Sequence, residues 1–285
     1  MKDAQITLVG LGLMGGSLAM RLKQDQTCRV VVALLRREEA AREAESLGVV
    51  DRATTNPANA LRDADIVIFG TPVRILLKQL HTFADFYKSG AIITDMGSTK
   101  RAIAAEMSKL PPRVYPVGSH PMCGKEVAGL SAAEATLYQD ATWIISPLSR
   151  TPQGAIKILR ELALSLGARP LGLEPDRHDK LTAAISHAPY LLSAGLVLAA
   201  QTVADEDETL WKVAASGFRD TSRIAASDVN MMMDILLTNK DAASDMLQRI
   251  QQQLNALVQA LSTDDEDALH SLLQTAAAQR RALYQ

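Results

Sequence analysis

The sequence predicts an α/β protein with a doubly wound, mostly parallel sheet, followed by an all-helical domain. In the first half of the chain, short continuous apolar runs alternate with amphipathic helical stretches, which is typical of parallel strands buried on both faces. After the Glu174-Pro175-Asp176 stretch, only long helical patterns follow. The length of 285 residues also favours two domains over one.

The predicted strands are short runs rich in Val and Ile: Ile6–Val9, Arg29–Leu35, Ile66–Phe69, Ala91–Thr94, Val114–Val117, Trp143–Ser146 and Ala168–Leu173. Helical patterns separate several of them, at Ser17–Lys23, Glu38–Leu47 and Thr151–Leu166. The second half predicts helices at Arg177–Ala204, Glu208–Ala215, Val229–Thr238, Asp241–Leu261 and Asp264–Tyr284. We therefore predict a sheet-based domain over residues 1–173 and an all-helical domain over residues 176–285.

Composition excludes several classes of function. Hydrophobic residues make up 47% of the chain, and 30 basic against 32 acidic residues give a net charge of −2 without a basic block, so we expect no nucleic-acid partner. Cys28 and Cys123 are too few for a disulfide framework, and no His/Cys/Asp cluster has metal-ligand spacing, so we expect no metal and a cytoplasmic location. The N-terminus does not resemble a signal peptide.

The stretch Ala183–Val203 is apolar nearly all round. It contains Ser186, His187 and Pro189 and lacks basic flanks, so we interpret it as a buried helix and expect no membrane partner. A small helical domain cannot easily cover such a helix by itself. We therefore favour a homodimer interface over the plainer interpretation as an internal core helix.

A glycine motif follows the first predicted strand. Residues 10–15 read G-x-G-x-x-G, with Gly10, Gly12 and Gly15 at the fixed positions and Leu13 and Met14 between them. In this context, the first glycine allows a tight turn, the second lets a pyrophosphate approach the backbone, and the third lets helix pack on strand. The free N–H groups of the helix then bind the diphosphate. We predict a Rossmann-like site for a nicotinamide dinucleotide; a glycine turn without a ligand is the alternative.

The choice between NADP and NAD depends on the end of the second strand. An NAD-preferring site usually has a carboxylate there, whereas Arg36 and Arg37 follow this strand and the first acids are Glu38 and Glu39. A guanidinium group pairs well with a 2′-phosphate, so we predict NADP, with NAD as the alternative. Thr71 and Pro72 follow the Ile66–Phe69 strand and are predicted to contact the cofactor.

Two polar segments follow later strands. Thr94–Lys100 contains Ser98, and Gly118–Glu126 contains His120. Ligands bind at the carboxyl edge of open α/β sheets. A hydroxyl and an imidazole at this edge suit the oxidation of an alcohol, because a base must accept the hydroxyl proton as the hydride leaves. The alternative is a structural role for both side chains.

Five motifs in order carry a resemblance to a known family. They are the glycine motif, D-x-x-S-x-K at Asp95–Lys100, G-x-H-P-M-x-G at Gly118–Gly124, Ile185–Pro189 and Gly217–Arg223. Together they resemble the prephenate/arogenate dehydrogenases of tyrosine biosynthesis over essentially the whole chain. The resemblance implies an NAD(P)-dependent oxidative decarboxylation of prephenate or arogenate by a homodimer, with the site between the two domains.

The resemblance also implies roles for individual residues. His120 is the base that hydrogen-bonds the ring hydroxyl, and Ser98 helps to place the hydroxyl and the nicotinamide. Arg223 grips a substrate carboxylate, and Arg219 in the same motif is predicted to bind substrate. His187 matches the first His of a His-x-Pro-His motif.

Two positions bear on the choice between prephenate and arogenate. Tyr190 stands where family members specific for prephenate often carry a second His, which favours arogenate or both substrates. Glu126 is predicted to face the substrate side chain, where a carboxylate would favour the ammonium of arogenate. It could instead pair with Arg223 as a gate, or simply begin a helix.

The remaining histidines are His81, His178 and His270. They lie in charged or amphipathic stretches and are predicted to be solvated.

A β-hydroxyacid dehydrogenase or imine reductase is the main rival enzyme, but such enzymes usually depend on a helix-borne Lys. A non-catalytic NADP-binding sensor or assembly protein is the third alternative.

Overall fold

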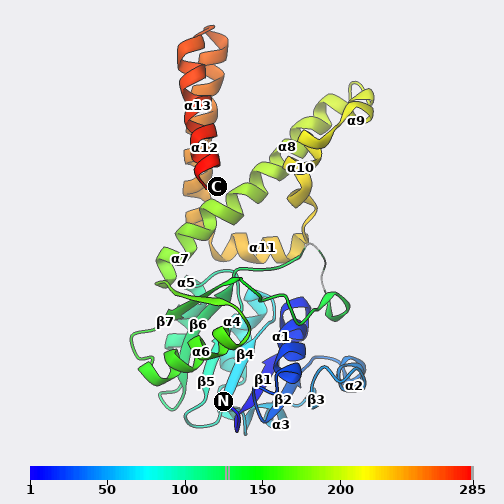
Figure 1. Ribbon diagram of the computed structural model, residues 1–285, viewed down its shortest axis with the longest axis vertical. Coiled ribbons are helices and arrows are strands. Elements are labelled where there is room, and N and C mark those ends of the chain that lie inside the picture. The colour runs from blue at the N-terminus through cyan, green and yellow to red at the C-terminus, as the bar shows by residue number, and fades with distance from the viewer. Residues whose placement is uncertain (126, 128, 284–285) are drawn as a thin grey trace. The chain divides into compact units, whose positions relative to one another are not determined.

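The computed structural model describes residues 1–125, 127 and 129–283. Its first part is built on an eight-stranded sheet with the strand order β3-β2-β1-β4-β5-β6-β7-β8 (Figure 1). The strands are β1 (Gln5–Val9), β2 (Val30–Leu34), β3 (Arg52–Thr54), β4 (Ile66–Phe69), β5 (Ile92–Asp95), β6 (Tyr115–Pro121), β7 (Thr142–Pro147) and β8 (Arg169–Gly172).

Neighbouring strands are parallel except β6 and β7, which pair antiparallel. The doubly wound, mostly parallel fold is therefore confirmed. Strand β3 and the reversal at β7 were not predicted. Strand β3 is three residues long and begins with an exposed Arg52, so it lacks the apolar run that marks the other strands.

Each central strand is buried on both faces. In β4, Ile66 and Ile68 enter one hydrophobic core, while Val67 and Phe69 enter the other. Helices that contribute to the first core are α1 (Leu13–Gln24), α2 (Glu38–Ser46) and α6 (Gln153–Ser165). Helices that contribute to the second core are α3 (Pro57–Leu61), α4 (Val73–Thr82) and α5 (Arg101–Ser108). Both faces are thus covered, and the strand ends remain available for ligands.

The helical part begins with one long segment. It consists of α7 (Pro175–Thr182), a π-helical turn η3 (Ala183–His187) and α8 (Ala188–Ala204). The predicted helix over 177–204 is therefore present, with a π turn inside it. Such turns are frequent at functional sites. The turn contains His187, which is buried.

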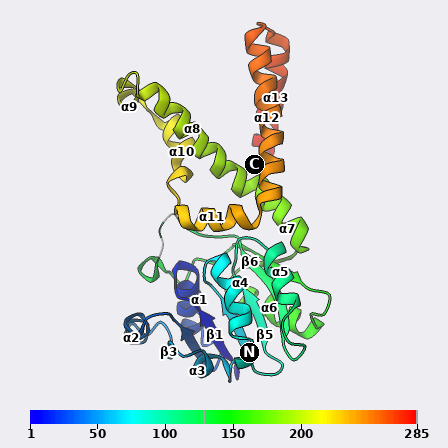
Figure 2. The same cartoon turned by 180° about the vertical axis from the view of Figure 1, so that it is seen from behind.

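Shorter helices follow in the same compact unit: α9 (Thr209–Val213), α10 (Ser216–Ser222), the 3₁₀ turn η4 (Arg223–Ala226) and α11 (Val229–Thr238). Both α10 and η4 pack on α8, and α11 packs on α4 (Figure 2). Arg74 of α4 pairs with Asp234 of α11. Helix α10 was not predicted, because its sequence lacks an apolar stripe.

Contacts divide the chain into Met1–Asn239 and Lys240–Gln285. The second unit is a helical hairpin of α12 (Lys240–Ser262) and α13 (Glu266–Ala282), in which the Asp265 carboxylate accepts a hydrogen bond from the Ala268 backbone N–H and caps α13. The division predicted from sequence falls elsewhere, in the link between β8 and α7.

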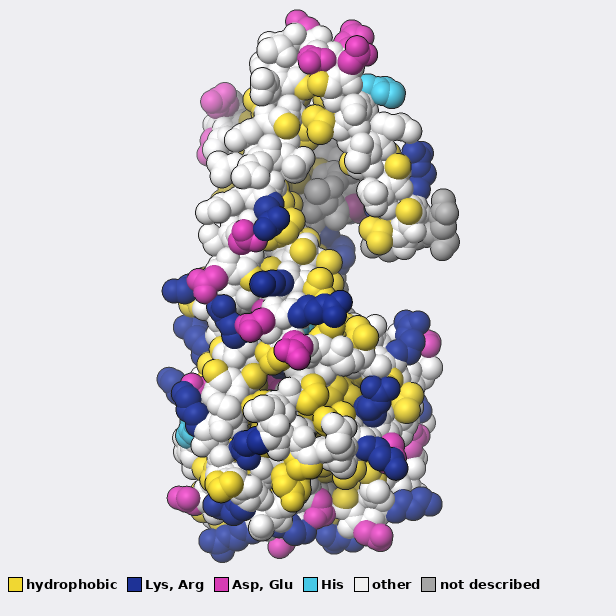
Figure 3. All heavy atoms as spheres, turned by 90° about the vertical axis from the view of Figure 1, so that its left-hand side faces the viewer, with side chains coloured by type: hydrophobic (Ala, Val, Ile, Leu, Met, Phe, Trp, Pro, Cys, Tyr) yellow, Lys and Arg dark blue, Asp and Glu magenta, His cyan; other side chains and the backbone are white. Residues whose placement is uncertain are grey.

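Helix α8 leaves large apolar side chains uncovered. Leu198 is 70% exposed and Val203 is 52% exposed, and hydrophobic side chains reach the surface in the helical part (Figure 3). The segment Pro175–Ala204 is long and apolar enough to cross a membrane, but length and composition alone do not indicate a membrane protein. A helix that a partner subunit covers has the same character.

Candidate active site

The glycine turn lies between β1 and α1, at the carboxyl edge of the sheet. Gly10 has a φ of +92°, which favours glycine, and a Cβ at Gly15 would lie 2.2 Å from the Gly10 carbonyl oxygen. A Cβ at Gly12 would meet nothing within 4 Å. The turn therefore needs its first and third glycines for its own packing, and the second faces open space. This cradle fits a dinucleotide phosphate.

Leu13 and Met14 form the first turn of α1, whose N-terminus has no side-chain cap. The backbone N–H groups of this turn are therefore suited to bind an anion. After the neighbouring strand β4, Thr71 donates a hydrogen bond to the side chain of Gln79 at 2.7 Å, and Pro72 directly precedes α4. Both lie at the carboxyl end of β4, which pairs with β1.

Arg36 and Arg37 are exposed directly after β2. Strand β2 ends beside the glycine turn, because the Gly10 N–H donates to the Leu34 carbonyl at 3.0 Å. The nearest carboxylates are engaged elsewhere: Glu38 accepts a hydrogen bond from Thr55, and Glu39 pairs with Arg42. The end of β2 is therefore cationic.

A second cluster of polar side chains lies at the ends of β5 and β6. Asp95 pairs with Lys100, and both side chains are fully buried. The same carboxylate accepts the backbone N–H groups of Gly97 at 2.8 Å and Ser119 at 3.0 Å. Because Asp95 ties these two segments together, it fixes the loop that carries Ser98 relative to His120. Ser98 itself is partly exposed.

His120 stands near the end of β6 and contacts α7. Its Nδ1 lies 2.8 Å from Nε2 of His178, and the two rings meet edge to face. His178 is fully buried, so the prediction that it is solvated is wrong; His81 and His270 are exposed, as predicted. The charged sequence around His178 suggested solvent, but α7 turns this residue toward the sheet. A histidine directly preceding an aspartate near a predicted helix start was the available signal.

Asp179 joins α7 to the start of α5. Its carboxylate accepts the N–H groups of Lys100 at 2.6 Å and Arg101 at 2.9 Å, together with Nδ1 of His178 at 2.8 Å. Burial alone would raise the pKa of Asp179, but these hydrogen bonds hold its pKa below the ordinary value. Asp179 is therefore an ionised acceptor beneath the two histidines.

The imidazole of His120 is held neutral. Burial lowers its pKa well below the ordinary 6.5, and the positive charge of Lys100 lowers the pKa further, as do His178 and His187. A neutral imidazole has one nitrogen free to accept a proton. The arrangement therefore suits a general base at neutral pH.

His187 lies in the same network. The Asn239 side-chain amide donates to the Asp179 carbonyl at 2.7 Å and lies 3.2 Å from Nδ1 of His187. Burial lowers the pKa of His187 to about 4. Since Asn239 donates at Nδ1, Nε2 of a neutral His187 carries the proton and is a hydrogen-bond donor.

The remaining predicted residues lie on the helical segments. Tyr190 is half-buried in the first turn of α8, three residues after His187. Arg219 and Arg223 are exposed, on α10 and η4. Glu126 lies outside the described residues. The structure thus brings together His120 and His187 and adds His178, Asp179, Lys100 and Asn239, which were not predicted as site residues.

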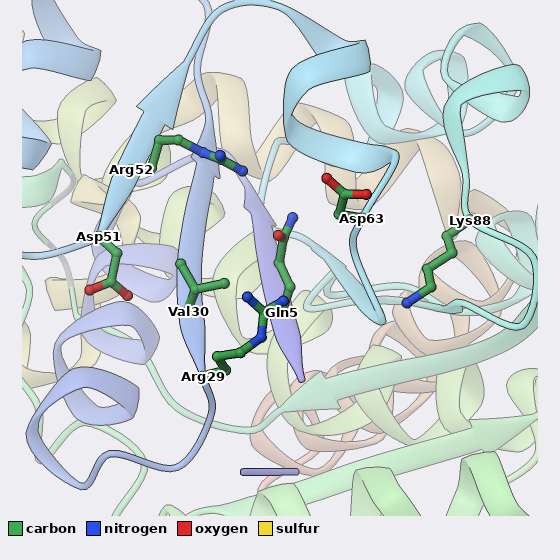
Figure 4. Close-up of a pocket in the computed structure, with 7 residues that line it drawn as sticks. All are labelled: Gln5, Arg29, Val30, Asp51, Arg52, Asp63 and Lys88. Carbon is green, nitrogen blue, oxygen red and sulfur yellow. The ribbon is translucent and has the colours of Figure 1, made fainter. Parts of the chain in front are cut away.

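A surface cavity of about 460 Å³ lies at the opposite edge of the sheet. Figure 4 shows its charged lining at the amino ends of β1, β2 and β3, including Arg29, Asp51, Arg52 and Lys88. Several of these groups already have partners, since Lys88 pairs with Asp65 and Asp51 pairs with Lys23. Cofactors of open α/β sheets bind at the other edge.

Comparisons with known proteins identify the family of the chain. Residues 18–171 match the prephenate dehydrogenase nucleotide-binding domain, and residues 174–275 match the prephenate dehydrogenase dimerization domain. The second match supports the predicted homodimer.

Three relatives illustrate the similarity. The chain is 33% identical to a prephenate dehydrogenase from Bacillus subtilis, over 99% of this chain and 76% of the relative. It superposes on the Aquifex aeolicus prephenate dehydrogenase, solved with hydroxyphenyl propionate and NAD+, with a TM-score of 0.93, 26% identity and 99% coverage of both chains. A Synechocystis arogenate dehydrogenase gives a TM-score of 0.86 at 30% identity, with 98% of this chain and 99% of that chain covered.

The nucleotide-binding match and the NAD+ complex of a relative also support the predicted nicotinamide cofactor. The chain belongs to the prephenate dehydrogenase family, which confirms both the predicted family and the predicted activity, an NAD(P)-dependent oxidative decarboxylation of prephenate or arogenate.

Proposed function

We propose that His120 is the general base of this reaction. The observation that carries the proposal is the His120 imidazole at the carboxyl edge of a dinucleotide-binding sheet, bonded through Nδ1 to His178. Burial there holds the pKa of His120 below its ordinary value. Nε2 of His120 accepts the proton of the ring hydroxyl while hydride leaves. The bound nicotinamide supplies the hydride acceptor. The bond to the ring carboxylate then breaks, and its electron pair makes the ring aromatic as CO₂ leaves.

The other side chains bind and orient the substrate. Ser98 helps to place the hydroxyl against His120. His187, as a neutral donor at Nε2, hydrogen-bonds a substrate oxygen, with Tyr190 beside it. Arg223, assisted by Arg219, anchors a substrate carboxylate through charge-assisted hydrogen bonds.

Two substitutions test these roles. His120→Asn should lower kcat by about 10²–10⁴-fold with nearly unchanged KM values, because a positioned general base contributes about this much. Arg223→Ala should mainly raise KM, because a carboxylate anchor acts in the ground state and the transition state alike. Unchanged turnover in His120→Asn would remove His120 as the base. A loss of kcat alone in Arg223→Ala would remove Arg223 as the anchor.

We propose that NADP is the preferred cofactor. Arg36 and Arg37 are exposed beside the glycine turn, and the nearest acids, Glu38 and Glu39, have other partners. A guanidinium group pairs with the 2′-phosphate that distinguishes NADP from NAD. The ratio of kcat/KM for NADP+ over NAD+ tests this, and a ratio of one or less would contradict it.

We propose that the enzyme accepts arogenate as well as prephenate. Tyr190 replaces the second His that would favour prephenate, and Glu126 would attract an ammonium group. Relatives of both kinds are similar to this chain, one named for prephenate and one for arogenate. The test is kcat/KM for both substrates in the wild type and in Glu126→Gln. A strict prephenate preference that this substitution leaves unchanged would contradict the proposal.

We propose that residues 1–173 form the dinucleotide-binding domain and residues 176–285 form the helical dimerisation and substrate domain. We also propose that the enzyme lies in the cytoplasm. Cell fractionation tests the location, and separate expression of the two segments tests the division.

A further inference from the structure

A chain of hydrogen bonds leads away from His120. Nδ1 of His120 lies 2.8 Å from Nε2 of His178, and Nδ1 of His178 lies 2.8 Å from the Asp179 carboxylate. The ring centroids of the two histidines are 5.1 Å apart, with an interplanar angle of 61°. His178 is fully buried and Asp179 is 2% exposed, so water does not compete for these bonds.

The partners of Asp179 determine where the protons lie. Its carboxylate already accepts two backbone N–H groups, from Lys100 and Arg101, and an ionised carboxylate has no proton to donate. Nδ1 of His178 must therefore carry the hydrogen of the bond to Asp179. In a neutral His178, Nε2 is then an acceptor, and Nδ1 of His120 must donate to it.

We propose that His178 is a positioning residue for the reaction. Backed by Asp179, it accepts the Nδ1 proton of His120, which orients that ring and leaves its Nε2 as the proton acceptor. The inference rests on the proposed role of His120 as the base. His178 itself contacts neither substrate nor cofactor in this account.

The same chain of bonds assists after proton transfer. His120 then becomes an imidazolium ion, with Lys100 and His187 as further nearby basic groups. Lys100 is paired with Asp95, so its charge is partly balanced. Asp179, acting through His178, is the carboxylate that balances the new charge on His120.

The direct test is the proton position in the wild-type enzyme. Long-range ¹H–¹⁵N correlation spectra of protein labelled in its five histidines distinguish a protonated from an unprotonated ring nitrogen. Signals are assigned by comparison with His120→Asn and His178→Gln. The proposal predicts protons on Nδ1 of both His120 and His178. A proton on Nε2 of His120, as a doubly protonated His178 would require, overturns it.

Kinetics of two variants give an independent test. His178→Leu removes the acceptor and should lower kcat by about 10²-fold with little change in KM, as expected when a catalytic group loses the partner that fixes its orientation. His178→Gln keeps an acceptor oxygen at similar reach and should recover at least part of the loss. The exposed His81→Gln is the matched control and should behave as wild type.

Wild-type turnover in His178→Leu would overturn the proposal, as would equal losses in the Leu and Gln variants. If neither variant folds, the wild-type spectrum still tests the predicted Nδ1 proton of His120, because comparison with His120→Asn assigns the His120 signals. Failure of the base assignment is recognised separately, because His120→Asn would then retain turnover whatever the proton positions.

Discussion

The two edges of the sheet carry similar charged residues in different settings. At the carboxyl edge, the Lys100–Asp95 pair is fully buried, and Asp95 also binds two backbone N–H groups. At the amino edge, the Lys88–Asp65 pair has side chains 45% and 35% exposed, beside an open cavity. Burial makes the first set rigid and lowers the pKa of Lys100, whereas solvent screens the charges of the second. Charges held in fixed positions are the ones that can stabilise a reaction, so the carboxyl edge fits a catalytic site and the amino edge does not.

The largest contrast should appear when one lysine of each pair is removed. Lys100→Met leaves the Asp95 charge buried and unpaired and should cost about 3–5 kcal/mol of unfolding free energy. Lys88→Met should cost about 0–1 kcal/mol, because its pair is solvated. Urea denaturation of both variants measures the difference. Similar losses at the two edges would contradict the comparison.

The sequence predicted the buried strands and the glycine turn because both depend on local pattern. Ser98 and His120 were placed correctly at strand ends, because parallel strands of one sheet end at the same edge. His178 was missed, because its burial depends on how α7 packs against that edge, which local charge does not reveal. Asn239 was missed for a similar reason, since its partners lie 60 and 52 residues away.

The carboxyl edge should also make stability depend on pH. His120 and His187 have folded-state pKa values below 6.5, about 4 for His187, so the unfolded chain takes up protons first as the pH falls. Unfolding free energy should therefore fall between about pH 6.5 and pH 4, by on the order of 2–3 kcal/mol for His187.

Urea denaturation across this range measures the slope. The variant His187→Gln should flatten it, because that group no longer binds a proton on unfolding. A slope that is the same in this variant and in the wild type would show that His187 is not the source.

A smaller contrast concerns one arginine at each edge. Arg36→Ala should lower the preference for NADP+ over NAD+ by about 10- to 150-fold, since a charge-assisted hydrogen bond contributes about 1.5–3 kcal/mol. Arg52→Ala, at the amino end of β3, should leave the preference unchanged. The ratio of kcat/KM for NADP+ over that for NAD+, measured in both variants and in the wild type, gives the result. An equal effect of both substitutions would indicate long-range charge rather than contact with the 2′-phosphate.

The proposed role of His120 as the proton acceptor is tested most directly by following hydride transfer alone. A single-turnover measurement of nicotinamide reduction, with enzyme in excess over substrate and saturating NADP+, follows that step without product release. His120→Asn should lower the single-turnover rate of nicotinamide reduction by about 10²–10⁴-fold, while substrate and NADP+ binding remain as in the wild type. A single-turnover rate in His120→Asn equal to that of the wild type would contradict it.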